Sequence, residues 1–169
     1  MYKRILSAVI LCTVLLQAGA VGTDRNRDKS DDGFTTIVFD RAYSPVPYRI
    51  PAIAETRRGT LLAACDFRFS HTDVGWNNRN GRWQINVVMK RSEDHGRTWS
   101  DTLCVARGDE QAADTVRTAF GDPCIVADRT SDNVLMSCVA GKIGYQTATR
   151  RNPMHAFFFR STDGGRTWD

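Results

Sequence analysis

Short runs of alternating hydrophobic and polar residues fill most of the chain after residue 33. A period of two predicts strands with one buried face, and the Gly, Pro, Asn and Asp residues between the runs predict turns. Little of the sequence has the 3.6-residue period of a helix. The pattern therefore predicts an all-β fold. The expected strands are 35–39, 53–56, 60–65, 85–91, 124–128, 134–139 and 156–160, the fifth and sixth forming a hairpin.

The first twenty residues have a different character. Lys3 and Arg4 give a basic start, residues 5–16 are almost wholly apolar, and residues 18–20 are small. This order predicts a signal peptide, residues 1–20, cleaved after Ala20, with an uncleaved membrane anchor as the alternative. Residues 21–33 are charged and polar, and we expect a flexible leader there. The mature chain would be exported, to the medium, the periplasm or the cell surface, with no membrane span of its own.

Charge and cysteine content narrow the function classes. The formal net charge of +4 falls to about +2 without Lys3 and Arg4, which is too mild for a nucleic-acid-binding protein. Export permits disulfides, but no cysteine pair has the spacing of a metal site. We favour buried free thiols over disulfides for the cysteines that follow the signal peptide. These are Cys65, Cys104, Cys124 and Cys138.

One eight-residue pattern, Ser-x-Asp-x-Gly-Arg-Thr-Trp, occurs at residues 92–99 and again at 161–168. Its Asp can accept hydrogen bonds from backbone N–H groups just ahead, Gly takes a conformation that other residues resist, and Trp buries a large ring. A repeated turn implies a repeated unit. We expect structural roles for Ser92, Asp94, Gly96, Thr98, Trp99, Ser161, Asp163, Gly165, Thr167 and Trp168.

The pattern resembles the Asp-box of sialidases and related β-propellers. Upstream, residues 48–51 read Tyr-Arg-Ile-Pro and resemble the motif that opens the sialidase catalytic domain. Residues 66–68 and 71–73 follow in the order found in the first blade of bacterial-type sialidases. The similarity runs from about Tyr48 to Asp169. It implies a six-bladed β-propeller, of which residues 34–169 would be an incomplete, N-terminal part.

Strand spacing sets the expected size of that part. The two patterns start 69 residues apart, whereas a four-stranded blade takes about 40–50 residues. The excess predicts an inserted loop near residues 108–120. At about 10 residues per strand with its turn, the chain would supply about three blades.

The resemblance implies an exo-α-sialidase, which releases terminal sialic acid from glycoproteins, glycolipids and oligosaccharides with retention, without metal or other cofactor. Arg49 matches the first of three arginines that bind the sialic acid carboxylate, a pairing that suits the guanidinium fork. Asp73 matches the general acid/base, with Asp66 as the rival. Arg68 and Asp122 match residues that line the sugar pocket. A surface Arg and turn-forming Asp residues are the plain alternatives.

The same resemblance assigns the nucleophilic Tyr, its Glu partner and two further arginines to later blades, beyond residue 169. We therefore expect this chain alone to be inactive. A non-catalytic Asp-box propeller module that binds glycans or proteins is the alternative function, and a truncated gene product without activity is a third.

Overall fold

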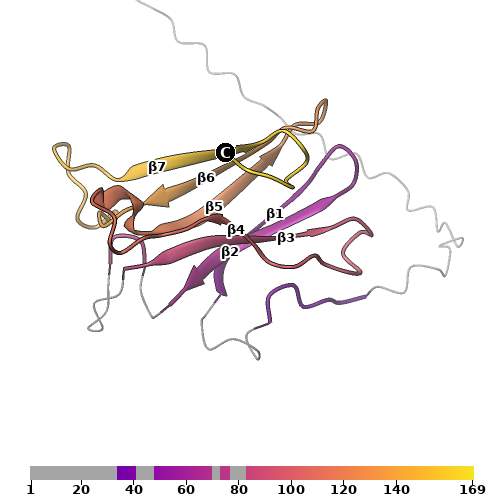
Figure 1. The fold of residues 1–169 in the computed structure, drawn as a ribbon, viewed down its shortest axis with the longest axis horizontal. Coiled ribbons are helices and arrows are strands. Elements are labelled where there is room, and N and C mark those ends of the chain that lie inside the picture. Colours follow the sequence, from indigo (N-terminus) through magenta and orange to yellow (C-terminus); the bar gives the residue numbers. More distant parts are fainter. Residues whose placement is uncertain (1–33, 41–47, 70–72, 77–82) are drawn as a thin grey trace, which may run out of the picture. The chain divides into compact units, whose positions relative to one another are not determined.

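Seven β-strands in two antiparallel sheets form the described part of the chain (Figure 1). The computed structural model describes residues 34–40, 48–69, 73–76 and 83–169. The expected signal peptide, residues 1–20, and leader, residues 21–33, lie outside the described residues. No described helix is long and apolar enough to cross a membrane.

The first sheet has the strand order β1-β2-β3-β4. Its two central strands are buried along nearly their whole length, because they have neighbours on both edges and lie against the second sheet. A turn closed by the Gly59 N–H bond to the Thr56 carbonyl (2.9 Å) joins the first two strands. The strands are β1 (Tyr48–Glu55), β2 (Leu61–Arg68), β3 (Ile85–Ser92) and β4 (Leu103–Ala106).

The second sheet contains β5 (Phe120–Ala127), β6 (Val134–Ala140) and β7 (His155–Ser161), in that order. Burial alternates along β6 and β7, so one face of this sheet is covered and the other is open. Leu135 and Phe158 lie among the exposed large apolar residues. The alternation in the sequence thus corresponds to a two-faced sheet.

One hydrophobic core joins the two sheets, which lie as two layers in Figure 1. Strand β5 contacts β1, β2 and β3, so the start of the second sheet lies against the first. Each fully buried Leu or Met side chain contributes about 1.5–3 kcal/mol through removal from water. The core includes Leu62, Val87, Met89, Phe120, Val134 and Met136.

Strands β1 and β5 share one backbone irregularity. Ile50 has φ 52° and Asp122 has φ 55°, and a proline follows each of them. Positive φ is a strained conformation for β-branched Ile, whereas Asp tolerates it better. The pairing registers shift at these points, as at a β-bulge, and bulges redirect side chains next to sites. The shifts lie between Arg49 and Ala52 and between Gly121 and Cys124.

The two repeated turns follow β3 and β7 and have matching hydrogen bonds. In the first, Asp94 Oδ1 accepts from the Thr98 N–H (2.9 Å) and from Ser92 Oγ (2.8 Å). In the second, Asp163 Oδ1 accepts from the Thr167 N–H (2.9 Å) and from Ser161 Oγ (2.7 Å). Each serine hydroxyl also accepts the N–H of the following glycine, Gly96 or Gly165, at 2.8 Å. In both turns the Trp Nε1–H donates to that glycine's carbonyl.

The predicted all-β class is confirmed, and six predicted strands coincide with β1, β2, β3, β5, β6 and β7. The prediction of a strand at 35–39 is wrong, because the described residues there form bends and coil. Strand β4 was missed, because its four residues are too few to show alternation.

The expected three blades are too many for the described residues, which form one four-stranded and one three-stranded sheet. Long connections explain the difference: β4 and β5 are separated by residues 107–119, where the 3₁₀-helix Thr115–Thr118 lies, and β6 and β7 by residues 141–154.

Among the four described cysteines, all free, Cys65 and Cys138 are buried and Cys104 is intermediate. Cys124 is exposed, so its interpretation as a buried residue is wrong. It lies on the open face of β5, directly after the bulge.

Candidate functional site

Three carboxylates meet where the two sheets come together. Asp66 lies on β2, Asp73 follows β2, and Asp122 lies on the bulge of β5. One oxygen from each lies within 4.8 Å of the other two. Because β5 packs against β1 and β2, residues more than fifty positions apart in the sequence share one site.

Arg68, the last residue of β2, compensates the negative charge of this cluster. Its Nη2 lies 2.6 Å from Asp66 Oδ2 and 3.0 Å from Asp73 Oδ1, and its Nε donates to Asp66 Oδ2 at 2.9 Å. The side chains of Arg68 and Asp66 are both 0% exposed. Buried charges require such partners, since an unpaired charge away from water is very costly. The guanidinium thus supplies at this point the positive charge that three clustered carboxylates would otherwise draw from a cation.

Asp73 connects this buried pair to the surface. Its Oδ1 accepts a hydrogen bond from the Val74 N–H at 2.8 Å and forms an ion pair with Arg68. Its backbone pairs with Trp76 through two hydrogen bonds of 2.9 Å, which close a tight loop. The side chain is 45% exposed, so one oxygen is anchored and the carboxylate still reaches solvent. A carboxyl group held this way can exchange a proton with a bound molecule.

Burial and charge also shift the acidity of the other two carboxyls. Burial raises the pKa of Asp66 to about 6, against the opposing effect of the Arg68 hydrogen bond. Burial, and then the Asp73 charge, raise the pKa of Asp122, while the charges of Arg68 and Arg49 lower it. The charge of Arg49, from β1, therefore acts on the same site.

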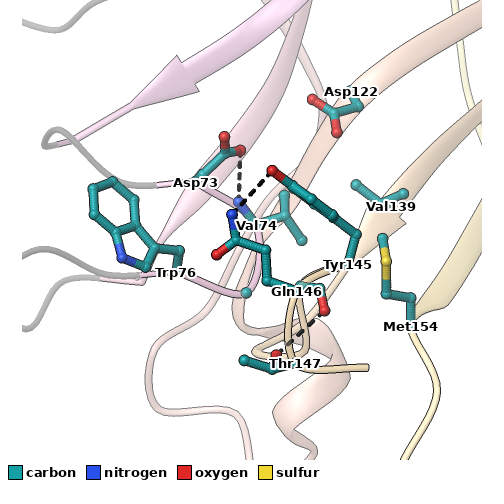
Figure 2. A pocket seen from close by; sticks show the side chains of 11 residues that line it. Asp73, Val74, Trp76, Asp122, Val139, Tyr145, Gln146, Thr147 and Met154 are labelled. Atoms are coloured by element: carbon teal, nitrogen blue, oxygen red, sulfur yellow. Dashed lines mark hydrogen bonds between the residues drawn. The ribbon is translucent and has the colours of Figure 1, made fainter. Parts of the chain in front are cut away.

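A pocket of about 390 Å³ opens beside Asp73 and Asp122. Figure 2 shows Trp76, Tyr145 and Gln146 around the same hollow, with Gln146 Nε2 donating to the Tyr145 hydroxyl at 3.0 Å. Apolar and polar groups both line it, as is usual for small-molecule sites. The lining residues are Asp73, Val74, Gly75, Trp76, Asp122, Val139, Gly144, Tyr145, Gln146, Thr147 and Met154.

Two glycines let the loops on either side of this pocket approach each other. Gly75 has φ 74°, and a Cβ atom there would overlap the backbone of Ile143 and Gly144. A Cβ atom on Gly144 would lie 3.0 Å from the Val74 carbonyl oxygen. Main chain packs on main chain here, so the pocket wall depends on the absence of side chains at both positions.

The structure brings most of the predicted site residues together. Asp73 and Asp122 line the pocket, whereas Arg68 lies behind them, fully buried, and is not a lining residue. Arg49 is exposed on β1 and also does not line the pocket, although its charge acts on Asp122. The ten residues of the repeated turns do not line it either.

Sequence reasoning missed several of the residues that form the pocket. Trp76, Val139, Tyr145, Gln146 and Met154 lie in segments with no recognisable motif, and only the fold places them beside Asp73. The exposure of Trp76 (59%) and Tyr145 (78%) is unusual for large aromatic side chains. That signal exists only in the folded chain.

Comparisons with known proteins point to one family. No protein-family model matches the chain. The sialidase of Micromonospora viridifaciens is 34% identical over 128 residues, which cover 72% of this chain and 18% of the relative. The sialidase of Bacteroides fragilis is 29% identical over 132 residues, covering 72% and 23%. The chain therefore spans about a fifth of the length of these relatives.

A solved structure agrees with this relationship. The Hadza microbial sialidase Hz136 superimposes with a TM-score of 0.54 and 24% identity, over 72% of this chain and 25% of that one. At that identity the likeness shows the fold, a sialidase propeller, of which the described sheets are a part. Over the part that it shares with these proteins, the chain is related to the sialidase family.

Proposed function

We propose that the protein takes part in exo-α-sialidase chemistry, the hydrolysis of terminal sialic acid from glycoconjugates with retention at the anomeric carbon. The observation that carries this proposal is the geometry of Asp73. Its carboxylate stands at the edge of a 390 Å³ pocket and is anchored through Oδ1 by buried Arg68. Relatives named sialidase are 34% and 29% identical to this chain over 128 and 132 residues.

In this proposal Asp73 acts as the general acid/base. It gives its proton to the glycosidic oxygen as the bond to the anomeric carbon breaks, and the leaving sugar departs as a neutral alcohol. The resulting carboxylate then takes a proton from the water that hydrolyses the glycosyl intermediate. Sialidases form that intermediate on a tyrosine, and no described residue is assigned to this role.

Arg49 would bind the sialic acid carboxylate, since its guanidinium offers a planar fork to two oxygens. Asp122 would meet the hydroxyl and amide side of the sugar. Arg68 is fully buried behind the pocket and pairs with Asp66 and Asp73. We therefore assign it to holding these two carboxylates rather than to contacting the sugar. The asymmetry between exposed Asp73 and buried Asp66 favours Asp73 as the acid.

We further propose that the protein is exported by a signal peptide at residues 1–20, as its basic start and apolar run suggest. Sialylated glycans at cell surfaces and in secretions would then be accessible to it.

The test uses the product of the whole reading frame, incubated with an α-sialyl oligosaccharide and followed by ¹H NMR. Release of sialic acid, first as the α-anomer, supports the proposal. First release of the β-anomer contradicts retention. Binding without release indicates a glycan-binding module, and neither binding nor release refutes the proposed function.

A further inference from the structure

The buried carboxylate of Asp66 contacts two groups that belong to different sheets. Its Oδ2 accepts from Nε (2.9 Å) and Nη2 (2.6 Å) of Arg68, on its own strand β2. Its Oδ1 accepts the backbone N–H of Asp122, on β5, at 2.8 Å. We propose that Asp66 is the positioning residue of the site, which fixes Asp73 and Asp122 relative to each other across the two sheets. This inference rests on the proposed function for its catalytic meaning.

The bulge at Asp122 needs such a partner. Its φ of 55° is uncommon for any residue but glycine, and the register of β5 with β6 shifts between Gly121 and Cys124. A backbone N–H displaced from its ladder and turned inward requires another acceptor. Asp66 Oδ1 is that acceptor. Gly121 makes the approach possible, since a Cβ atom there would lie 2.7 Å from Val74 Cγ2 and 3.2 Å from Asp66 Oδ2.

The other oxygen of Asp66 acts on Asp73 through Arg68. The guanidinium that Asp66 orients reaches Asp73 Oδ1 with its Nη2, at 3.0 Å. One continuous set of contacts thus runs from the Asp122 N–H through Asp66 and Arg68 to Asp73. The hydrogen-bond partners of the Asp66 carboxylate in these contacts are all donors. An amide at position 66 could satisfy one donor with its oxygen, but its NH₂ group would face the other donor.

Asp66 is placed to hold other groups rather than to react. Its side chain is 0% exposed, and it is not among the residues that line the pocket. The titratable groups around it include Arg68 and the Cys65 thiol on the same strand and Asp73 after it. Asp122 on β5 and the Cys138 thiol on β6 face it from the second sheet. With its pKa raised to about 6, Asp66 is a carboxylate at neutral pH and loses its charge in mildly acidic solution. The Asp122 N–H should sense this change directly.

Nuclear magnetic resonance on the full ¹⁵N-labelled chain tests this placement. We expect the amide proton of residue 122 to shift between pH 5 and 7, because an amide bonded to a carboxylate responds when that carboxylate is protonated. Asp122→Asn removes that residue's own carboxyl, so a response that persists in this variant comes from a neighbouring carboxyl, Asp66 or Asp73. Asp66→Asn must abolish it. Asp109→Asn is the matched control, because the Asp109 carboxylate accepts the Gln111 N–H at 2.8 Å. Replacing that carboxylate should change the chemical shift of the Gln111 amide and leave the residue 122 amide as in the parent.

Kinetics of the product of the whole reading frame give the catalytic readout. Asp66→Asn should lower kcat on sialyl oligosaccharides by about 10²-fold, the effect of displacing groups by about 1 Å, with a much smaller change in KM. Asp109→Asn should leave both unchanged. If the parent hydrolyses no sialoside, the proposed function fails, and the amide titration alone decides whether Asp66 holds Asp122. A pH-insensitive residue 122 amide in Asp122→Asn, or kcat within a few-fold of the parent in Asp66→Asn, overturns the inference.

Discussion

Arg68 and Asp73 form an ion pair, 3.0 Å between Nη2 and Oδ1, in which one side chain is fully buried and the other is 45% exposed. The pair therefore extends from the interior to the pocket edge. Asp66 also holds the guanidinium, because its Oδ2 lies 2.6 Å from the same Nη2. The loop that carries Asp73 thus has a rigid anchor, as a site that must hold a reacting group in place requires.

Arg49→Lys should mainly weaken substrate binding. A lysine keeps the charge but cannot reproduce the bidentate fork, so KM should rise about 10–100-fold with kcat nearly unchanged. Steady-state kinetics of the product of the whole reading frame measure both constants. Arg129→Lys, at an exposed position in the β5–β6 turn, is the matched control. A fall in kcat at constant KM would contradict the proposal that Arg49 binds the substrate carboxylate.

Ser92→Ala and Ser161→Ala should each destabilise the fold. Both serines are 1% exposed, and each hydroxyl accepts a glycine N–H and donates to the turn aspartate. Loss of the acceptor leaves a buried N–H without a partner, at a cost of about 1–3 kcal/mol. Urea unfolding followed by tryptophan fluorescence measures the change. Exposed Thr102→Ala serves as control, and serine variants as stable as that control would show that the hydroxyls are dispensable.

Asp94 should make the stability of the fold depend on acid. Hydrogen bonds from the Thr98 hydroxyl and N–H and from Ser92 lower its pKa to about 2, below the value of about 3.9 expected in the unfolded chain. The native state therefore favours the carboxylate, and this contribution is complete above about pH 4 and is lost as the pH falls toward 2. Thermal melts from pH 5 to 2 should show a shallower decline for Asp94→Asn than for the parent. Asp101→Asn is the control. If the melting temperature of Asp94→Asn falls with pH as steeply as that of the parent, the Asp94 carboxylate does not carry this acid dependence.

Alternation and turn chemistry predict β1, β3, β6 and β7 because each of these strands has its own turn signals and apolar residues. The pocket differs, because much of its wall comes from residues 74–76 and 144–147, which have no strand period or motif. Asp73 and Asp122 could be proposed only through a family resemblance. The position of Arg68 behind the pocket depends on its contact with Asp66, which no spacing rule reveals.

The cysteines should differ sharply in reactivity. Burial raises the pKa of Cys65 and of Cys138 to about 12, which suppresses the reactive thiolate, whereas Cys124 is exposed. Iodoacetamide at pH 8 should modify Cys124 rapidly and the two buried thiols only after denaturation. Peptide mass spectrometry at timed quenches measures each site. Equal rates for Cys124 and Cys138 in the native protein would contradict the arrangement of β5 and β6.

The role of Asp73 as the general acid/base is the central claim, and Asp73→Asn in the product of the whole reading frame tests it most directly. The substitution keeps the shape of the side chain but removes the transferable proton. We expect kcat/KM on a sialyl oligosaccharide to fall about 10²–10⁴-fold. The loss should be much smaller on an aryl sialoside with an activated leaving group, which needs little protonation, and Asp101→Asn should match the parent on both substrates. A rate on the oligosaccharide within a few-fold of the parent would contradict the account.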